Sequence, residues 1–375
     1  MDVTIIYGGR SGEHEISLVS AAAVARGIDR KHSISLIGIT KKGRWYLQDK
    51  KLLEKIRADD SAALCIEENE NMSVSVVPGA GQNSLVADGK PVRTDVVFPV
   101  LHGTYGEDGT VQGLFEMAGL PYVGCTNLSS ALTMDKEKTK MILESVGIPV
   151  VPYVCMKRHV MMNSAVYDEF IKAAEEELGF PMFVKPCCAG SSNGAARADN
   201  PKELSYTLME AFQWDNKVLL EKAVNAREVE CSVTGNSVTA PADSETETVT
   251  AYIPGEIVPT HRFYDYDAKY NDSNGASLRI PADLSENDIE KIRKAACAAY
   301  RAVDGAGLCR VDFFIDRDSG AVYLNEINSM PGFTPISMFP KMCAAAGLEF
   351  TALTELLMEE AVALFRTKSG LNTSR

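Results

Sequence analysis

Several features that define other classes of protein are missing from this sequence of 375 residues. Its nine cysteines include no Cys-x-x-Cys pair and no nearby histidine at zinc-binding spacing, so neither a zinc site nor a disulfide scaffold is predicted. A signal-peptide pattern and a long apolar run are absent as well. We therefore expect reduced thiols in a cytoplasmic protein that has no membrane partner.

An excess of positive charge is also missing. The net charge of -13 at pH 7 argues against a surface that coats nucleic acid or docks on anionic lipid. Any site for phosphate groups must therefore be a local cluster of Lys and Arg. The Walker pattern and the G-x-G-x-x-G fingerprint are absent, so such a cluster differs from a P-loop or a Rossmann site.

The composition that remains is typical of a soluble globular protein. Apolar residues make up 45% of the chain and charged residues 24%. A chain of this length exceeds one ordinary domain, so two or three domains are expected.

A predicted β-hairpin over residues 310–328 organises the chemistry of the chain. Its two arms alternate between apolar and polar residues, as strands do, and Arg310, Asp312, Glu326 and Asn328 fall on the polar face. Hard oxygen donors on rigid strands suit Mg²⁺, which also takes waters and substrate phosphates. The alternative is an edge hairpin with a solvated polar face. The apolar arms and the irregular turn after the second arm favour a nucleotide–metal site.

The amino terminus reads as a strand over residues 2–7, a glycine-rich turn over 8–12 and a helix to about residue 28. Glu13 and Glu15 stand at the start of that helix, where a bound pyrophosphate would need positive charge. Dinucleotide binding is therefore disfavoured. Glu15 is a candidate for binding a cation such as the ammonium of an amino acid, with helix capping as the alternative.

A second candidate region follows the buried strand predicted over residues 95–101. The glycine-rich turn 102–109 comes at its carboxyl end, where open α/β sheets bind ligands. His102 and Glu107 are placed for such a ligand, unless the acids of the turn cap the next helix.

Two further loops carry polar or small residues. The loop 186–194 follows a predicted strand that ends in Lys185, and its Gly and Ser residues allow backbone N–H groups to approach phosphate oxygens. The loop 261–277 mixes aromatic and charged residues in an irregular run, which suits a lid. We call residues 186–194 the flap.

Taken together, these motifs resemble the D-alanine–D-alanine ligases of the ATP-grasp superfamily. The resemblance extends from Tyr7 to about Leu364 and weakens across residues 45–90, which look like an insertion. The stretches that match the family, in the family's order, are Gly8–Ser17, His102–Gly109, Met134–Lys140, Lys185–Gly194, Glu221–Glu228, Phe263–Tyr270, Arg310–Asp312 and Asn325–Gly332.

The resemblance implies an α/β (α+β) ATP-grasp fold with an N-terminal domain built on an open parallel sheet. The implied domains are an N-terminal substrate domain over 1–124, a central ATP-grasp subdomain with the flap over 125–216, and a C-terminal subdomain with the metal site and the lid loop over 217–375.

The resemblance also implies that ATP is clamped between two small antiparallel sheets. The implied ATP-binding residues serve the phosphates, the adenine pocket, the ribose and the lid, and they are Lys136, Lys185, Ser192, Glu221, Lys222, Val224, Glu228 and Lys269. Asp312, Glu326 and Asn328 are expected to hold two Mg²⁺ ions, for which Mn²⁺ can substitute.

For the amino-acid substrates the resemblance implies three contacts. Glu15 takes the ammonium of the first D-alanine, His102 lies near its carboxylate, and Ser337 helps to anchor the carboxylate of the second D-alanine. Glu107 is a further substrate-binding candidate. The implied catalytic residues are Glu15, Ser191, Tyr270, Arg310 and Gly332. Among these, Arg310 and the Gly332 N–H stabilise an oxyanion, and Ser191, linked to Glu15 and Tyr270, is the candidate for deprotonating the incoming amine.

The implied function is therefore ATP-dependent ligation of two D-alanines, through an acyl phosphate, for peptidoglycan synthesis. The nearest alternative is the same chemistry with D-serine or D-lactate as the second substrate. More distant alternatives are an ATP-grasp carboxylase or purine-pathway ligase, and a non-catalytic ATP-binding module. The sequence leaves the oligomeric state open, with a homodimer as one option.

Overall fold

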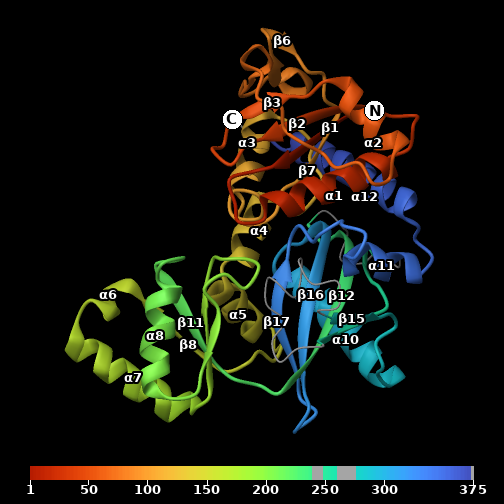
Figure 1. The fold of residues 1–375 in the computed structure, drawn as a ribbon. Coiled ribbons are helices and arrows are strands. Elements are labelled where there is room, and N and C mark those ends of the chain that lie inside the picture. Colours follow the sequence, from red (N-terminus) through yellow and green to blue (C-terminus); the bar gives the residue numbers. More distant parts are fainter. Residues whose placement is uncertain (239–247, 260–275, 373–375) are drawn as a thin grey trace.

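The computed structural model describes residues 1–238, 248–259 and 276–372 of the chain (Figure 1). The described strands form four sheets. The predicted lid loop 261–277 lies almost entirely outside the described residues, and so do its candidates Lys269 and Tyr270. Among the described helices, none has both the length and the apolar composition that crossing a bilayer requires.

The N-terminal sheet has the strand order β3-β2-β1-β7, with β2, β1 and β7 parallel and β3 antiparallel at the edge. Its strands are β1 (Asp2–Gly8), β2 (Ser33–Ile39), β3 (Trp45–Leu47) and β7 (Val96–Val100). The predicted strands over 2–7 and 95–101 are thus confirmed. Both are mainly apolar, because each face of this parallel sheet is covered.

One face of the N-terminal sheet packs on helices α1 (His14–Gly27), α2 (Lys50–Ala58) and α12 (Phe350–Ser369). The other face packs on α3 (Thr110–Ala118) and on a small antiparallel sheet. That small sheet lies in the segment predicted to be an insertion, and it consists of β4 (Val74–Val76), β5 (Leu85–Ala87) and β6 (Lys90–Pro91), accompanied by the short 3₁₀ helices Glu70–Met72 and Gly81–Asn83.

The central part of the chain forms an antiparallel sheet with the order β10-β9-β11-β8. Its elements are α4 (Asn127–Met134), α5 (Lys136–Ser145), β8 (Tyr153–Lys157), α6 (Arg158–Met161), α7 (Ser164–Leu178), β9 (Met182–Pro186), β10 (Ala196–Ala198), α8 (Pro201–Ala211) and β11 (Lys217–Lys222). The flap connects β9 to β10. Side chains at the N-caps define the helix starts, since Asn163 caps α7 and Asn200 caps α8.

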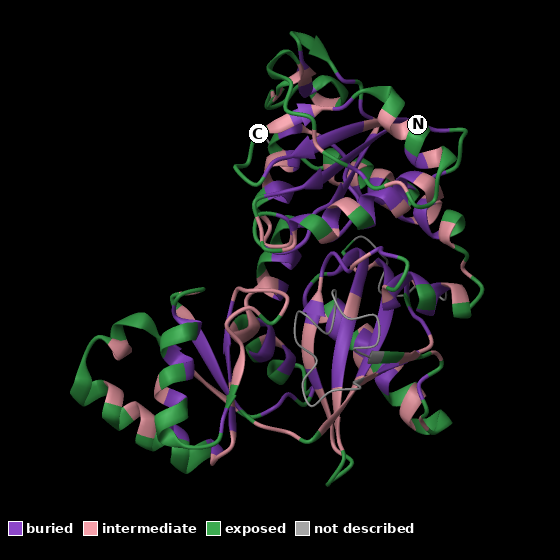
Figure 2. Ribbon diagram, viewed as in Figure 1, coloured by how far each residue is buried: buried purple, intermediate pink, exposed green. Residues whose placement is uncertain are grey.

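The C-terminal part forms a second antiparallel sheet with the order β15-β14-β12-β16-β17, and β13 also pairs with β12. Its elements are β12 (Ala226–Asn236), β13 (Val249–Ala251), β14 (Gly255–Pro259), β15 (Ala276–Arg279), α10 (Glu286–Ala302), β16 (Ala306–Asp316), β17 (Val322–Asn328) and α11 (Met338–Ala345). Strands β16 and β17 are the predicted hairpin. Figure 2 shows that β12 and β16 are among the most buried parts of this sheet.

The last helix, α12, returns to the N-terminal sheet. Its buried side chains Leu353, Leu357 and Met358 belong to the same core as Val3 and Phe98 of the first sheet. Figure 1 shows α12 beside α1, above the C-terminal sheet from which the chain has just come. The two ends of the chain therefore share one hydrophobic core.

Candidate functional site

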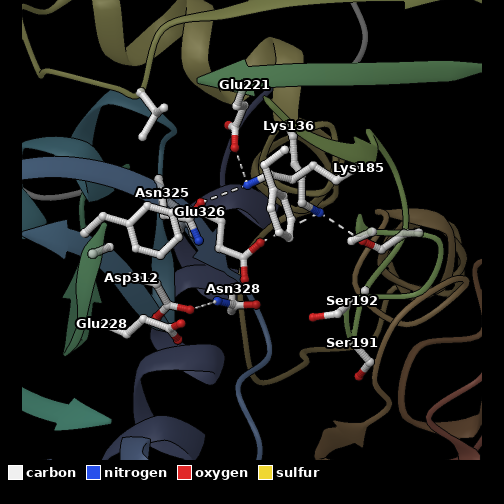
Figure 3. Close-up of a pocket in the computed structure, with 18 of the residues that line it drawn as sticks. Lys136, Lys185, Ser191, Ser192, Glu221, Glu228, Asp312, Asn325, Glu326 and Asn328 are labelled. Carbon is white, nitrogen blue, oxygen red and sulfur yellow. Dashed lines mark hydrogen bonds and ion pairs between the residues drawn. The ribbon is translucent and has the colours of Figure 1, made fainter. Parts of the chain in front are cut away.

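A cavity of about 1090 Å³ lies between the central sheet and the C-terminal sheet, and loops of the N-terminal sheet close one end of it (Figure 3). Most of the residues that the sequence singled out line it. These are His102, Glu107, Lys136, Lys185, Ser191, Ser192, Glu221, Lys222, Val224, Glu228, Arg310, Asp312, Glu326, Asn328 and Gly332. Glu15 and Ser337 are not in its lining.

The hairpin register explains why its polar residues meet. Asp312 in β16 pairs with Glu326 in β17, and Arg310 pairs with Asn328, so the four side chains share one face. Asn328 Nδ2 donates to Asp312 Oδ2 over 2.9 Å, and Arg310 donates to Asp312 through Nε and Nη2, both over 2.7 Å. The position of Arg310 is thus fixed by a bidentate contact.

A second carboxylate accompanies Arg310. Glu230 Oε2 lies 3.0 Å from Arg310 Nε. Burial alone would lower the pKa of Arg310, but the Asp312 and Glu230 carboxylates outweigh it and raise that pKa well above its ordinary value. Arg310 is therefore a permanent cation in the floor of the cavity.

The central sheet contributes a cluster of buried charges on the opposite side. Glu221 in β11 is only 2% exposed, and its two oxygens lie 2.7 Å from Lys140 Nζ and 2.6 Å from Lys185 Nζ. Burial opposes ionisation of Glu221, but the two ammonium groups outweigh it and lower its pKa. Lys185 also donates to Asn325 Oδ1 over 3.1 Å, which ties the central sheet to the hairpin.

Lys136, the first residue of α5, enters the cavity from a third direction. Its Nζ donates to the Ala189 carbonyl of the flap over 2.9 Å and lies 3.7 Å from Glu326 Oε2. Lys136 and Lys185 thus bring two ammonium groups to the side of the cavity that faces the Asp312 and Glu326 carboxylates (Figure 3).

The flap is held in an uncommon backbone conformation. Ser191 and Ser192 have φ angles of 52° and 57°, in the left-handed region that side chains other than glycine rarely adopt. The Ser191 hydroxyl donates a hydrogen bond to Glu13 Oε1. The preceding Gly190 leaves room for this contact, because a Cβ there would lie 2.9 Å from Glu13 Oε2.

The prediction that Glu15 contacts Ser191 is therefore wrong, because Glu13 accepts that hydrogen bond and lines the cavity. Glu15 lies on the outer side of α1, where its side chain is 60% exposed and pairs with Lys41 at 2.5 Å. Successive helix residues turn by about 100°, so two acids two positions apart point in nearly opposite directions.

A signal for Glu13 was present in the sequence. Ser17 stands one helical turn after Glu13, and its hydroxyl accepts the Gly8 N–H at the end of β1 over 2.7 Å. A small polar residue four positions along the helix marks the side that faces the end of the strand. Lys140, the other missed residue, follows Lys136 by one turn in the same way.

His102 and Glu107 connect the N-terminal domain to the turn after the hairpin. His102 Nδ1 lies 3.1 Å from the Met330 carbonyl, and Nε2 lies 3.1 Å from Ser20 Oγ. Burial lowers the pKa of His102. Glu107 accepts the Gly103 N–H over 2.7 Å and the Met330 N–H over 3.3 Å. Burial, with the Glu13 carboxylate adding to it, raises the pKa of Glu107 to about 8.

Gly332 ends this turn. A Cβ at Gly332 would lie 2.7 Å from Ser337 Oγ, which bonds the Thr334 N–H over 3.0 Å and the Thr334 hydroxyl over 2.7 Å. Ser337 therefore stands directly behind the turn, although it is not part of the cavity lining.

Models of known families match both halves of the chain. The model described as "D-ala D-ala ligase N-terminus" matches residues 2–125, and that described as "D-ala D-ala ligase C-terminus" matches residues 142–359. The chain belongs to the D-alanine–D-alanine ligase family. Members of this family depend on ATP.

Relatives within the family match over almost the whole length. A D-alanine–D-alanine ligase of Treponema denticola is 52% identical over 100% of both chains, and one of Clostridium acetobutylicum is 44% identical over 95% of this chain and 96% of its own. The predicted family is thus confirmed.

Solved structures agree with this ligase family. The D-alanine–D-alanine ligase of Coxiella burnetii is 32% identical with a TM-score of 0.80, covering 98% of this chain and 96% of that one. VanG, a D-Ala:D-Ser ligase of Enterococcus faecalis, is 35% identical with a TM-score of 0.79, covering 96% and 99%. The predicted ATP-grasp fold is confirmed by these neighbours.

The hairpin of this ligase fits a divalent cation. Within the described residues there is no group of three or more His, Cys, Asp or Glu side chains arranged to hold a metal. The Asp312 and Glu326 carboxylates and the Asn328 amide oxygen instead offer two charged donors and one neutral donor on one face. An incomplete oxygen set of this kind suits Mg²⁺, which keeps waters and takes substrate phosphates as its other ligands.

Proposed function

We propose that this protein joins two D-alanines into D-alanyl-D-alanine at the expense of ATP, through an acyl phosphate, for peptidoglycan synthesis in the cytoplasm. One observation carries the proposal. A single cavity is lined by lysines that include Lys136 and Lys185, by the Gly- and Ser-containing flap, by a pair of carboxylates on the hairpin, and by Glu13 of the N-terminal domain. The lysines, the flap and the hairpin carboxylates suit a nucleoside triphosphate with its metal ions. Glu13 suits the ammonium of an amino acid.

In this proposal ATP lies between the two antiparallel sheets. Lys136 and Lys185 contact the phosphates under the flap and Ser192, while Lys222 and the backbone at Val224 line the adenine pocket. Glu228 binds the ribose. Glu221 is expected to act mainly by holding Lys185, because both of its oxygens are paired with lysines. Lys269 would bring the lid loop to the transferred phosphate.

The metal site is proposed to hold two Mg²⁺ ions, with Mn²⁺ as a substitute, on Asp312, Glu326 and Asn328. Bound there, the cations would neutralise charge on the phosphates and favour their transfer. Arg310, held on Asp312, keeps that carboxylate oriented toward the cavity.

The chemistry of the first step follows from charge. A carboxylate is a poor electrophile, so the first D-alanine must be phosphorylated before an amine can attack it. We propose that Glu13, in place of Glu15, binds its ammonium group. His102 and Glu107 lie on the adjacent wall, near the carboxylate that receives the phosphoryl group.

In the second step the amine of the other D-alanine attacks the acyl phosphate and creates a tetrahedral oxyanion, whose collapse breaks the bond to phosphate, releases inorganic phosphate and leaves the amide. Arg310 and the Gly332 N–H are the proposed donors to it, each contributing on the order of a few kcal/mol. Ser191 is the proposed acceptor of the amine proton, while its own hydroxyl proton passes along the hydrogen bond to Glu13. Tyr270 is the expected second partner of Ser191. Ser337, behind the Gly332 turn, would help to anchor the second carboxylate.

A second candidate function is ligation of D-alanine to D-serine or D-lactate. The similarity to VanG favours including it, because that D-Ala:D-Ser ligase is 35% identical over 96% of this chain. Tyr270 argues for an amide-forming enzyme, because its side chain is neutral near pH 7 and therefore does not repel an incoming ammonium group.

The proposal also includes the domain limits expected from the sequence and a homodimeric state.

The experiment is a phosphate-release assay with ATP, Mg²⁺ and a panel of D- and L-amino acids and D-lactate, with the products identified by mass. Release with D-alanine alone, giving the dipeptide, is the expected result. Preferred formation of a mixed product with D-serine or D-lactate would favour the second candidate. Absence of release with every acceptor, in protein that binds ATP, would favour a non-catalytic module.

A further inference from the structure

Lys217 makes an unusual set of contacts just outside the cavity. It is the first residue of β11, and its ammonium lies 2.6 Å from Asp135 Oδ1 and 2.8 Å from Glu137 Oε2. These two acids are the residues on either side of Lys136, the proposed phosphate ligand of α5. The Lys217 ammonium group therefore holds the residues on both sides of Lys136.

The contacts fix the start of α5. Asp135 is the N-cap of this helix, and its side chain accepts the Lys138 N–H over 3.2 Å. With Asp135 and Glu137 directed toward Lys217, the side chain between them is directed the other way, toward the Ala189 carbonyl in the flap. The direction of Lys136 thus depends on its two neighbours.

The same segment supports the flap. The Lys217 carbonyl accepts the Cys187 N–H over 3.0 Å, and the Cys187 carbonyl accepts the Lys136 N–H over 3.1 Å. Asp215 Oδ2 accepts the Cys188 N–H over 2.8 Å. Residues 215–217 therefore connect the beginning of the flap to the beginning of α5.

The far end of the flap contacts Trp214, the residue that precedes this segment. Trp214 packs against Gly194, where a Cβ would lie 2.5 Å from Trp214 Cδ1. Gly194 has a φ of 70°, so both space and backbone conformation require glycine there. Both ends of the flap thus contact the connection between α8 and β11.

Burial makes the charge contacts stronger than an ordinary surface pair. The Lys217, Asp135 and Glu137 side chains are 16%, 21% and 16% exposed. Burial alone would lower the pKa of Lys217, but the two carboxylates outweigh it and raise that pKa. An isolated surface pair is worth little, whereas a partly buried ammonium between two carboxylates restricts all three side chains.

We propose that Lys217 is a positioning residue for the nucleotide: through Asp135 and Glu137 it sets the direction of Lys136, and through its carbonyl it sets the base of the flap. This inference rests on the proposed function, because it assigns Lys136 and the flap to the phosphates. It predicts that loss of the ammonium weakens ATP binding selectively. Binding of D-alanine, on the Glu13 side, is expected to change little.

The test compares Lys217→Met with Lys217→Arg and with Lys157→Met. Lys157 is the cross-strand neighbour of Lys217 in β8, it is exposed, and it makes none of these contacts. Trp45 and Trp214 are the two tryptophans of the chain. In a Trp45→Phe background, Trp214 fluorescence therefore reports directly on the flap as ATP is added.

We expect Lys217→Met to raise the KM and the dissociation constant for ATP at least tenfold, and the KM for D-alanine less than twofold. Lys217→Arg should stay within about threefold of wild type, and Lys157→Met should match wild type. Glu137→Gln should raise the ATP constant in wild type more than in Lys217→Met, because the two residues act through one contact.

Equal increases in both KM values, accompanied by a lower melting temperature, would mean that Lys217 serves stability alone and would overturn the inference. Unchanged ATP binding in Lys217→Met would overturn it as well. If Lys217→Met fails to fold, the Glu137→Gln protein decides by the same two constants. Wild-type protein that binds no ATP would overturn the proposed function itself, which separates the two failures.

Discussion

The Ser191 hydroxyl donates a hydrogen bond to the Glu13 carboxylate, across 178 residues of chain. This bond connects the flap of the central sheet to the first helix of the N-terminal sheet, above the cavity. Ser191 has a positive φ, and a residue in that conformation costs on the order of 1–3 kcal/mol unless its surroundings hold it. The bond to Glu13 is one such restraint, so the site is ordered jointly by two domains.

The pair Glu13 and Glu15 gives a matched test of the substrate site. Glu13→Gln should lower kcat/KM for D-alanine at least a hundredfold, about 2.7 kcal/mol, because it removes the charge that faces the ammonium and weakens the bond to Ser191. Glu15→Gln, which loses only an exposed contact with Lys41, should stay within about twofold. Steady-state kinetics at several D-alanine concentrations measure both. Equal effects of the two substitutions would contradict the placement of Glu13.

The metal site can be tested at Glu326. Glu326→Gln preserves the size of the side chain but removes a charged oxygen ligand, so the protein should fold normally and lose nearly all phosphate release. A variant that retains more than about a tenth of wild-type turnover, a barrier change under ~1.4 kcal/mol, would refute the assignment. Circular dichroism and a Mg²⁺ titration of ATP turnover provide the control, with the residual activity expected to require more Mg²⁺.

Removing one of the buried charges of the central sheet is expected to cause a large loss of stability. Lys140→Met removes one of two cations from Glu221, which is 2% exposed, and should lower the free energy of unfolding by ~3–5 kcal/mol. Lys138→Met, two positions earlier on the exposed side of α5, should change it by less than ~1 kcal/mol. Urea unfolding followed by circular dichroism makes the comparison. Similar midpoints for the two variants would show that Glu221 does not need both lysines.

Glu360 in α12 predicts a pH dependence of stability. Burial raises its pKa to about 7, and Oε2 accepts no hydrogen bond from the described residues. The folded state therefore prefers the neutral acid, whose contribution is fully present below the unfolded pKa of about 4.5 and is lost as the pH rises through 7. Relative to Glu360→Gln, wild type should lose on the order of 1–3 kcal/mol between pH 5 and 8.

The control for this pH effect is Glu359→Gln, the adjacent and exposed position. Its stability should follow that of wild type at every pH, and the Glu360→Gln curve should be flatter than both. Parallel curves for all three proteins would mean that Glu360 is solvated in the folded state.

The hairpin was predictable because the alternation of apolar and polar residues that defines it is local in the sequence. Alternation along 310–328 specified which residues share a face, and the observed register pairs Asp312 with Glu326 as that pattern requires. The strands over 2–7 and 95–101 were predictable for the same reason, because mainly apolar runs define them, and they are observed as Asp2–Gly8 and Val96–Val100.

The choice between Glu13 and Glu15 is harder, because the Ser17 signal alone does not fix where the helix starts. It depends on whether the helix begins before or after residue 14, and helix ends are the least certain part of any pattern. The contact of Lys217 with Asp135 and Glu137 was not predictable either, because it joins residues about 80 positions apart. Nothing in the local pattern of β11 indicates which acids its first residue will meet.

The return of α12 to the first sheet affects how this chain can fold during synthesis. Domains usually form in order as they leave the ribosome, but the core around Val3 and Phe98 also needs Leu353 and Leu357. At elongation rates of about 5–20 residues per second, the segment from residue 126 to the carboxyl end takes roughly 12–50 s to make. For that time the first sheet has one apolar face incompletely covered, so nascent chains stalled before residue 350 should bind chaperones that recognise exposed apolar surface.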